Sequence, residues 1–130
     1  MLAALVPFLA LSLSAAPGDD CPAWRTDFAP SGASAELDAV HRHDAGDGSG
    51  EQLYAAGLFG AVTDAVALGV ARWDGTAWSC LGDGIVTTRQ WRVRELASVD
   101  LGGGPLLVAV GGFLEVEDAP TNGVAAWDGT

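Results

Sequence analysis

Two stretches of the chain are apolar at almost every position, one spanning residues 53–59 and the other residues 107–113. A strand with one buried face alternates apolar and polar residues, whereas a continuous apolar run of this length predicts a strand buried on both faces. The Ala and Gly residues inside these runs leave room for a neighbouring sheet to approach closely. No stretch has a 3.6-residue apolar period sustained over about ten positions, so the pattern predicts an all-β protein.

The first apolar run is one of four strands that we expect to pair in chain order as an antiparallel meander. Residues 36–40 precede it, and residues 69–73 follow it after a polar link. Asp74 and Gly75 form a two-residue hairpin signal, which predicts a return strand at residues 77–81.

The chain is similar to itself at a constant offset in residue number. Residues 53–76 align without a gap to residues 107–130, and 14 of the 24 positions are identical at this offset of 54. Residues 36–40 align to residues 95–99 at an offset of 59, so we expect the loops that follow them to differ by five residues. Repeats of this size are typical of solenoids, propellers or arrays. Four-stranded antiparallel meanders that are apolar on both faces favour β-propeller blades.

This interpretation divides the chain into four parts: residues 1–16 as a signal peptide, 17–35 as an N-terminal linker, 36–84 as a first propeller repeat and 85–130 as a second. The second repeat ends before its outer strand, so the chain holds about two blades of an incomplete propeller. A closed propeller needs at least four blades. We therefore expect either a fragment of a longer chain or an assembly of several copies.

The linker contains a candidate for a lone outer strand. Trp24 precedes Trp78 by the same offset as in the main repeat. The sequence leaves open whether this match is a coincidence.

The N-terminus has the composition of a secretory signal. It has no charged residue, an apolar run over residues 2–13 and small residues before Pro17, although no basic residue precedes the apolar run. The run is too short for a transmembrane helix, which needs about 20 apolar residues. We expect a secreted or cell-surface protein with no membrane insertion after removal of the signal. In that oxidising compartment Cys21 and Cys80 either form a disulfide, or Cys80 is a buried small apolar residue and Cys21 is a free thiol.

The charge of the chain narrows the range of partners. It has 6 Lys and Arg residues, all of them Arg, against 17 acidic residues, for a net charge of -11. Such a surface repels phosphate backbones and anionic lipid, which argues against nucleic-acid and membrane-surface partners. The absence of Lys excludes Schiff-base and Walker-type chemistry.

The pattern Leu-Tyr-x-x-Gly-x-Phe followed by Gly-Val-Ala-x-Trp-Asp-Gly-Thr-x-Trp-x-x-Leu-Gly resembles the WDG-type propeller repeats of large secreted bacterial proteins and of the fungal cortical polarity-marker family, which are kelch-like in style. The resemblance covers residues 36–130 and departs from the family at Leu58, where a second Gly is usual. It implies a structural or binding propeller and carries no catalytic residues. The residues that we assign to the repeat framework are Gly57, Phe59, Trp73, Asp74, Gly75, Trp78, Gly111, Phe113, Trp127, Asp128 and Gly129.

Two groups of residues are candidates for metal binding. The loop with Asp44, Asp47, Ser49 and Glu51 offers oxygen ligands for Ca²⁺, but its spacing does not fit an EF-hand and a solvated turn is the better interpretation. His41 and His43 point to one side of a strand without a third metal ligand in the sequence.

Asp74 and Asp128 could be taken as a carboxylate pair, but Asp at the first position of a turn accepts backbone N–H groups instead. Gly48-Ser49-Gly50 is not a nucleophile elbow, and Gly102-Gly103-Gly104 lacks the Lys of a phosphate loop. We therefore assign no catalytic, cofactor or metal residue.

Three functions remain: a non-catalytic propeller that binds a protein or glycan through its loops, a glycan-active enzyme whose site lies in other blades, and a cell-surface adhesion array. In each of them the partners of the blades are further blades of a longer chain or other copies.

Overall fold

The computed structural model describes residues 32–85, 92–116 and 119–130. The expected signal peptide, Cys21, Trp24 and all but the last residues of the linker lie outside this part of the chain. The described residues form β-strands, turns and loops, and their sheets are antiparallel. The expected all-β class is therefore confirmed.

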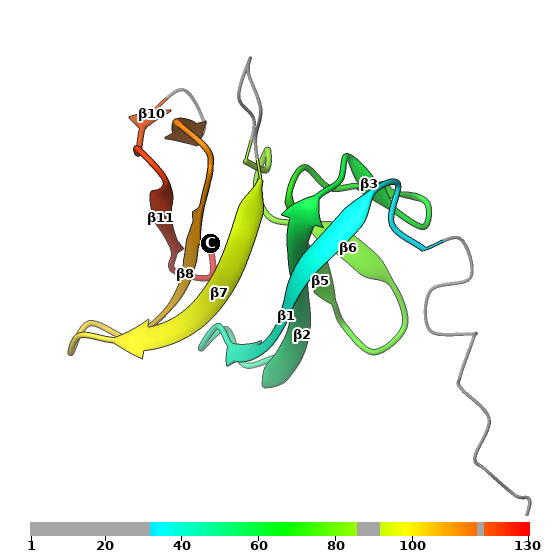
Figure 1. Ribbon diagram of the computed structural model, residues 1–130. Helices are drawn as coiled ribbons and strands as arrows, with labels where there is room; N and C mark the ends of the chain where they lie inside the picture. The colour runs from blue at the N-terminus through cyan, green and yellow to red at the C-terminus, as the bar shows by residue number, and fades with distance from the viewer. Residues whose placement is uncertain (1–31, 86–91, 117–118) are drawn as a thin grey trace, which may run out of the picture.

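Sheet 1 has four strands in the order β1-β2-β5-β6 (Figure 1). Its strands are β1 (Glu36–Asp44), β2 (Glu51–Leu58), β5 (Val70–Trp73) and β6 (Trp78–Cys80). The continuous apolar run gives a strand buried on both faces, because four consecutive residues of β2, from Tyr54 to Gly57, are buried.

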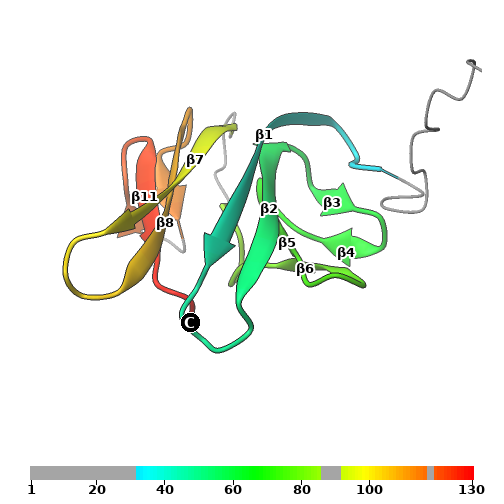
Figure 2. The same ribbon diagram turned by 90° about the horizontal axis from the view of Figure 1, so that it is seen from below.

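The link between β2 and β5 contains a short hairpin that the sequence pattern did not predict. Its strands are β3 (Ala61–Val62) and β4 (Ala65–Val66), joined by a turn in which Thr63 has a φ of 50°. Val62 and the nearby Ala67 are buried with Phe59 on the side of sheet 1 that faces away from sheet 2 (Figure 2). The hairpin therefore covers part of that side.

Sheet 2 has three strands in the order β11-β8-β7, with no strand beyond β11 among the described residues. Its strands are β7 (Val93–Asp100), β8 (Pro105–Gly111) and β11 (Val124–Trp127), and the short pair β9 (Glu115–Val116) and β10 (Ala119–Pro120) lies in the link between β8 and β11. Burial alternates along β8, so this apolar run is covered more fully on one face than on the other.

The main core lies between the two sheets, where β1 and β7 run side by side (Figure 1). Tyr54 of β2 is fully buried there, and Leu107 of β8 and Val93 of β7 reach it from sheet 2. Arg92 joins the sheets at the start of β7, because its guanidinium donates two hydrogen bonds, of 2.8 and 2.5 Å, to the Asp38 carboxylate of β1.

The same backbone hydrogen bonds occur in both aligned segments. Gly57 N–H donates to Gly69 O at 3.1 Å, and at the corresponding positions of the second segment Gly111 N–H donates to Gly123 O at 3.0 Å. The links between the strands also match, because the bond from Ala67 N–H to Gly60 O has its counterpart in the bond from Thr121 N–H to Leu114 O.

The structure corrects the alignment of the first strands. Gly57 pairs with Leu37 of β1, and Gly111 pairs with Val93 of β7, so the corresponding residues of these strands are 56 positions apart and not 59. The loops that follow differ by two residues, not five. Leu37 is 49% exposed, so the apolar side chain that suggested the alignment with Leu96 does not lie in the core.

The turn after β5 also differs from the expected two-residue hairpin. Trp73 pairs with Trp78, so residues 74–77 form a four-residue connection. The Asp74 carboxylate accepts hydrogen bonds from the N–H groups of Thr76 and Ala77, at 2.7 and 2.8 Å, and these bonds stabilise the longer turn.

Two close backbone contacts make one glycine in each sheet sensitive to substitution. A Cβ on Gly57 would lie 2.2 Å from Glu36 O, and one on Gly111 would lie 2.0 Å from Arg92 O. In both cases the partner strand has a register shift at this point.

We predict that Gly111→Ala lowers the free energy of unfolding by about 1–3 kcal/mol or more, because the methyl group forces β7 away from β8. Gly112→Ala is the matched control, since nothing lies within 4 Å of its Cβ position. Denaturant unfolding measures both. Equal effects of the two substitutions would contradict the steric role of Gly111.

Candidate functional site

A cavity of about 490 Å³ borders β11, the last strand of sheet 2 in the described part of the chain. Most of the residues that line it have apolar side chains: Val70 comes from β5, Leu81 and Ile85 from the segment after β6, and Leu107 and Trp127 from sheet 2. Its size is in the range of pockets that hold a ligand or a group of side chains. It is therefore a candidate for a binding site.

The corresponding edge in sheet 1 is occupied. There β6 pairs with β5, and Trp78 packs against Trp73 with ring centroids 5.4 Å apart. Trp78 is only 8% exposed. Trp127, which corresponds to Trp73 in the alignment, has a ring contact with Tyr54, at 5.9 Å, across the boundary between the sheets.

A polar cluster lies between the sheets beside Tyr54. The Ser98 hydroxyl of β7 is 2.9 Å from His41 Nε2 and 2.8 Å from His43 Nδ1, both of β1. The hydroxyl proton can go to only one imidazole, so the other imidazole must donate its own N–H to Ser98.

His43 is 2% exposed, and its Nε2 is buried with no hydrogen-bond partner in the described part of the chain. Burial, and secondarily the charge of His41, lower the pKa of this imidazole. The pair His41 and His43 is therefore a structural contact with sheet 2, and no third metal ligand joins it among the described residues.

Tyr54 links the histidines to the aromatic core. Its ring meets His43 edge-on at 5.6 Å, and its buried hydroxyl has no hydrogen-bond partner in residues 32–85, 92–116 or 119–130. Burial raises the pKa of Tyr54, an effect that the positive charge of Arg72 partly offsets.

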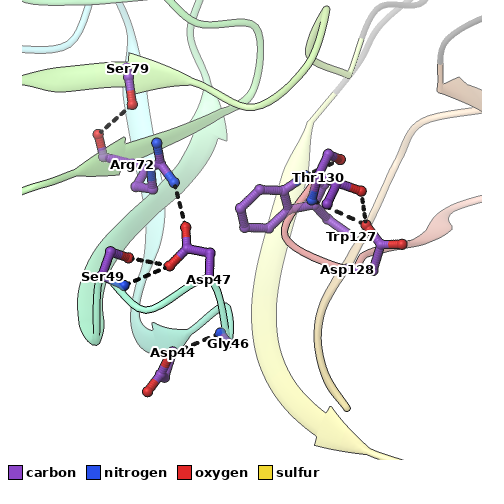
Figure 3. Close-up of polar contacts among 9 residues, drawn as sticks. All are labelled: Asp44, Gly46, Asp47, Ser49, Arg72, Ser79, Trp127, Asp128 and Thr130. Carbon is purple, nitrogen blue, oxygen red and sulfur yellow. Dashed lines mark hydrogen bonds and ion pairs between the residues drawn. The ribbon is translucent and has the colours of Figure 1, made fainter. Parts of the chain in front are cut away.

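The acidic loop between β1 and β2 uses its carboxylates to hold its own turns (Figure 3). Asp44 accepts a hydrogen bond from Gly46 N–H at 2.9 Å, and Asp47 accepts one from Ser49 N–H at 2.9 Å. Asp47 also faces Arg72 at 3.7 Å. The hydrogen bonds to Ser49 lower the pKa of Asp47.

No group of three metal-ligating side chains occurs in the described ranges, so the loop gathers no Ca²⁺ ligand set there. Glu51, the remaining acidic residue of that candidate site, forms an ion pair with Arg42 instead.

The loop between β1 and β2 of sheet 1 contacts two segments of sheet 2, the start of β8 and the turn after β11. Gly129 lies against the backbone of Ala45, where a Cβ would come within 2.8 Å of the carbonyl oxygen, and Gly46 lies beside Pro105 of β8. The chain end at Thr130 therefore lies beside the loop between β1 and β2.

The two aspartates of the Trp-Asp-Gly-Thr segments lie at corresponding turns. Asp128 accepts hydrogen bonds from the N–H and hydroxyl of Thr130, at 3.2 and 2.8 Å (Figure 3). Asp74 accepts the same two hydrogen bonds from Thr76. Hydrogen bonds to the ionised form lower the pKa of both carboxyls. Each carboxylate is engaged in its own turn.

The remaining framework residues have different surroundings. Phe59 and Phe113 are each 1% exposed, in separate clusters on the two sides of sheet 1. Cys80 is exposed, so it is not the buried apolar residue of the second alternative, and it has no disulfide partner among the described residues. The disulfide with Cys21 remains a prediction because Cys21 lies outside the described residues. Gly75 and Gly129 both have positive φ, of 104° and 99°.

The sequence analysis identified His41 and His43 as candidates. It did not identify Ser98 of β7, which contacts both histidines, or Arg92, which contacts Asp38 of the same strand β1. Neither residue belongs to a motif, and the alignment of β7 was wrong by three positions. A pattern of buried residues in β1 would have revealed the correct register, but most of that strand is exposed.

Comparison of the chain with family models, curated protein sequences and solved structures gives no match. No helix among the described residues is long and apolar enough to cross a membrane.

We predict that the protein loses stability as the pH falls from about 7 to 5, because protonating His43 places a charge in the core. The pKa of His43 is lowered on folding, so the unfolded chain takes up the proton first, near an unperturbed His pKa of about 6.5. The loss stops once the pH is below the folded pKa. The Asp carboxyls whose pKa is lowered titrate at a lower pH, so they do not contribute to the loss of stability between pH 7 and 5.

Thermal unfolding across this pH range tests the prediction. His43→Gln should flatten the profile, whereas the matched variant His41→Gln should keep most of the loss. The same slope in all three proteins would show that His43 is not the titrating group.

Proposed function

We propose that this chain is a secreted, non-catalytic repeat module of the β-propeller type, which acts as a binding or structural element. The observation that carries the proposal is which face of each sheet packs in the core. The two sheets do not use the same face: the face of sheet 2 that packs on sheet 1 corresponds to the face of sheet 1 that is turned away from sheet 2.

We call face A the side of each sheet that carries, in sheet 1, Leu53, Ala55, Ala71 and Trp73 and, in sheet 2, Leu107, Ala109, Ala125 and Trp127. In sheet 2, face A packs in the core between the sheets, whereas in sheet 1 it belongs to the separate cluster on the far side. The exposure of the first strands follows from this. Leu96 on face A of sheet 2 is 6% exposed, but the corresponding Val40 of sheet 1 is 65% exposed.

Face B is the other side, with Tyr54, Ala56 and Val70 in sheet 1 and Val108, Val110 and Val124 in sheet 2. In sheet 1 it is covered by sheet 2, and Val70 is 4% exposed. The corresponding Val124 of sheet 2 is 56% exposed.

A head-to-tail contact uses opposite faces of two like units, so a further unit can add by the same contact where an outer face is open. In this chain face B of sheet 2 is exposed at Val124, whereas the hairpin of β3 and β4 covers part of face A of sheet 1. Propellers and solenoids are built in this way, with each unit contacting only its neighbours. The internal sequence similarity and the matching hydrogen bonds support the same assignment.

The loops at the meeting point of the two sheets are our proposed contact surface for a protein or glycan. The strands correspond residue for residue, but the loop at 45–50 is two residues longer than the loop at 101–104. Loops of variable length on a constant scaffold are typical positions for binding residues.

Extension of the chain tests the stacking. Residue 131 would correspond to residue 77, so we append residues 77–130 after Thr130. We predict that Val124→Asp changes the free energy of unfolding by no more than about 0.5 kcal/mol in the original chain, where Val124 is exposed. In the extended chain the same substitution should cost roughly 2 kcal/mol or more, because the charge is buried. An equal cost in both chains would reject the stacking.

A loop exchange tests the binding role. We expect the labelled protein to bind selected members of a glycan or extracellular-protein array, and replacement of residues 45–50 by residues 101–104 should remove that binding without altering the far-ultraviolet circular dichroism spectrum. Substitution of Val66, which is 72% exposed in β4, by Ser is the control. Binding that survives the exchange would place the contact surface elsewhere.

A further inference from the structure

The end of β1 holds the loop between β1 and β2 against sheet 2 through three contacts. His43 Nδ1 lies 2.8 Å from the Ser98 hydroxyl of β7. Ala45 is 7% exposed, and a Cβ on Gly129 would lie 3.2 Å from its Cβ. Gly46 lies beside the start of β8. The loop is therefore fixed at its first residues, where the C-terminal end of the chain lies beside it (Figure 2).

His43 is the member of this set whose charge can change near neutral pH. A charged imidazole carries a proton on both nitrogens. Its Nδ1–H can donate to Ser98, but Nε2 is buried and has no hydrogen-bond partner in the described part of the chain. A neutral tautomer can leave only a lone pair at Nε2, whereas the charged form leaves an N–H that bears part of the charge. A buried charged donor without an acceptor costs much more free energy than a buried lone pair.

The groups around His43 do not supply the missing acceptor. The titratable and charged groups are His41 and Asp44 on its own strand, Tyr54 on β2, and two groups that act on Tyr54, Arg72 of β5 and Asp47 of the loop. The other two neighbours, Ser98 of β7 and Gln52 of β2, are neutral. Gln52 pairs with His43, but its amide oxygen is also buried without a partner among the described residues, so the two side chains do not bond to each other.

We infer that protonation of His43 releases the loop between β1 and β2 from sheet 2, so that mild acid opens the proposed contact surface. Water can reach the charged Nε2–H only if the end of β1 moves away from Ser98 and Tyr54. Ala45 follows this movement, because a single residue separates it from His43. The inference rests on the proposed function for the identity of the surface, and it adds the regulation of that surface: a partner bound at neutral pH is released in mild acid.

The open population of the loop rises as the pH falls. In the open form the imidazole is hydrated and titrates near about 6.5, whereas in the closed form burial lowers the pKa of His43. Each unit of pH below about 6.5 therefore raises the open population by up to tenfold, until the closed form also takes up the proton. This opening involves one loop and one strand end, so it needs less free energy than unfolding of the chain.

Thiol labelling at a buried position of the loop tests the release. In the full-length chain with Cys21→Ser and Cys80→Ser, Ala45→Cys places a thiol where the native residue is buried. Dithiodipyridine reacts with thiols in mild acid, and the labelling rate divided by that of the urea-unfolded chain at the same pH gives the open fraction. We expect this fraction to rise roughly five- to tenfold between about pH 7 and 5.5.

Ala71→Cys is the matched control for unfolding of the whole chain, because Ala71 is fully buried in sheet 1. We expect its open fraction to be at least roughly tenfold smaller than that of Ala45→Cys at each pH, since local opening does not expose it. Equal open fractions at the two positions would mean that the loop opens only when the chain unfolds, which would overturn the inference.

Two substitutions remove the titrating group, His43→Gln and the apolar His43→Phe. Either should make the open fraction of Ala45→Cys independent of pH in this range, whereas His41→Gln should keep the rise. A rise that persists without His43 would also overturn the inference. If neither His43 variant folds, the comparison of Ala45→Cys with Ala71→Cys still decides it.

The labelling uses no ligand, so its outcome is separate from that of the proposed binding role. Array members that bind the protein at pH 7 should be lost after transfer to pH 5.5 and kept by His43→Gln. Release of the loop without any bound array member would keep the pH effect and reject the binding role. A bound member that stays at pH 5.5 while the loop is released would reject the regulation.

Discussion

The packing of one sheet on the next is the constraint on which the rest of the structure depends. The main core is formed by residues from both sheets, so neither sheet forms it alone. Tyr54 is buried only because Leu107, Trp127 and their neighbours in sheet 2 cover it. The apolar composition of β2 has the same cause, since sheet 2 lies on one of its faces and the hairpin of β3 and β4 lies on the other.

This contact also determines which polar groups become buried. His43 and Ser98 lie on different sheets and meet only where the sheets meet. At one margin of the contact, Arg92 pairs with Asp38 and Glu36. Such pairs add little stability at an exposed surface.

Glycine and aspartate define the repeated local geometry. Gly57 and Gly111 allow the neighbouring strand to approach at its register shift, and Asp74 and Asp128 hold the turns that end β5 and β11. These residues act on the backbone, which explains why they recur at constant spacing while most exposed side chains change. Two sheets built alike in this way can pack with opposite faces together, as sheets 1 and 2 do.

The sequence by itself determined the strand class, the constant offset between the two aligned segments and the position of most strands, because a long apolar run or an Asp-Gly turn is a local signal. It did not determine the register of β1 and β7. Those strands are largely exposed and carry no apolar pattern, so only the backbone contacts with Gly57 and Gly111 decided their alignment. The hairpin of β3 and β4, the contact of Ser98 with two histidines and the cavity beside β11 also required the tertiary structure. The contact of Ser98 with the histidines and the cavity join residues that are distant in the chain and that only the packing of the two sheets brings together. The strands of the hairpin are too short to give a recognisable pattern in the sequence.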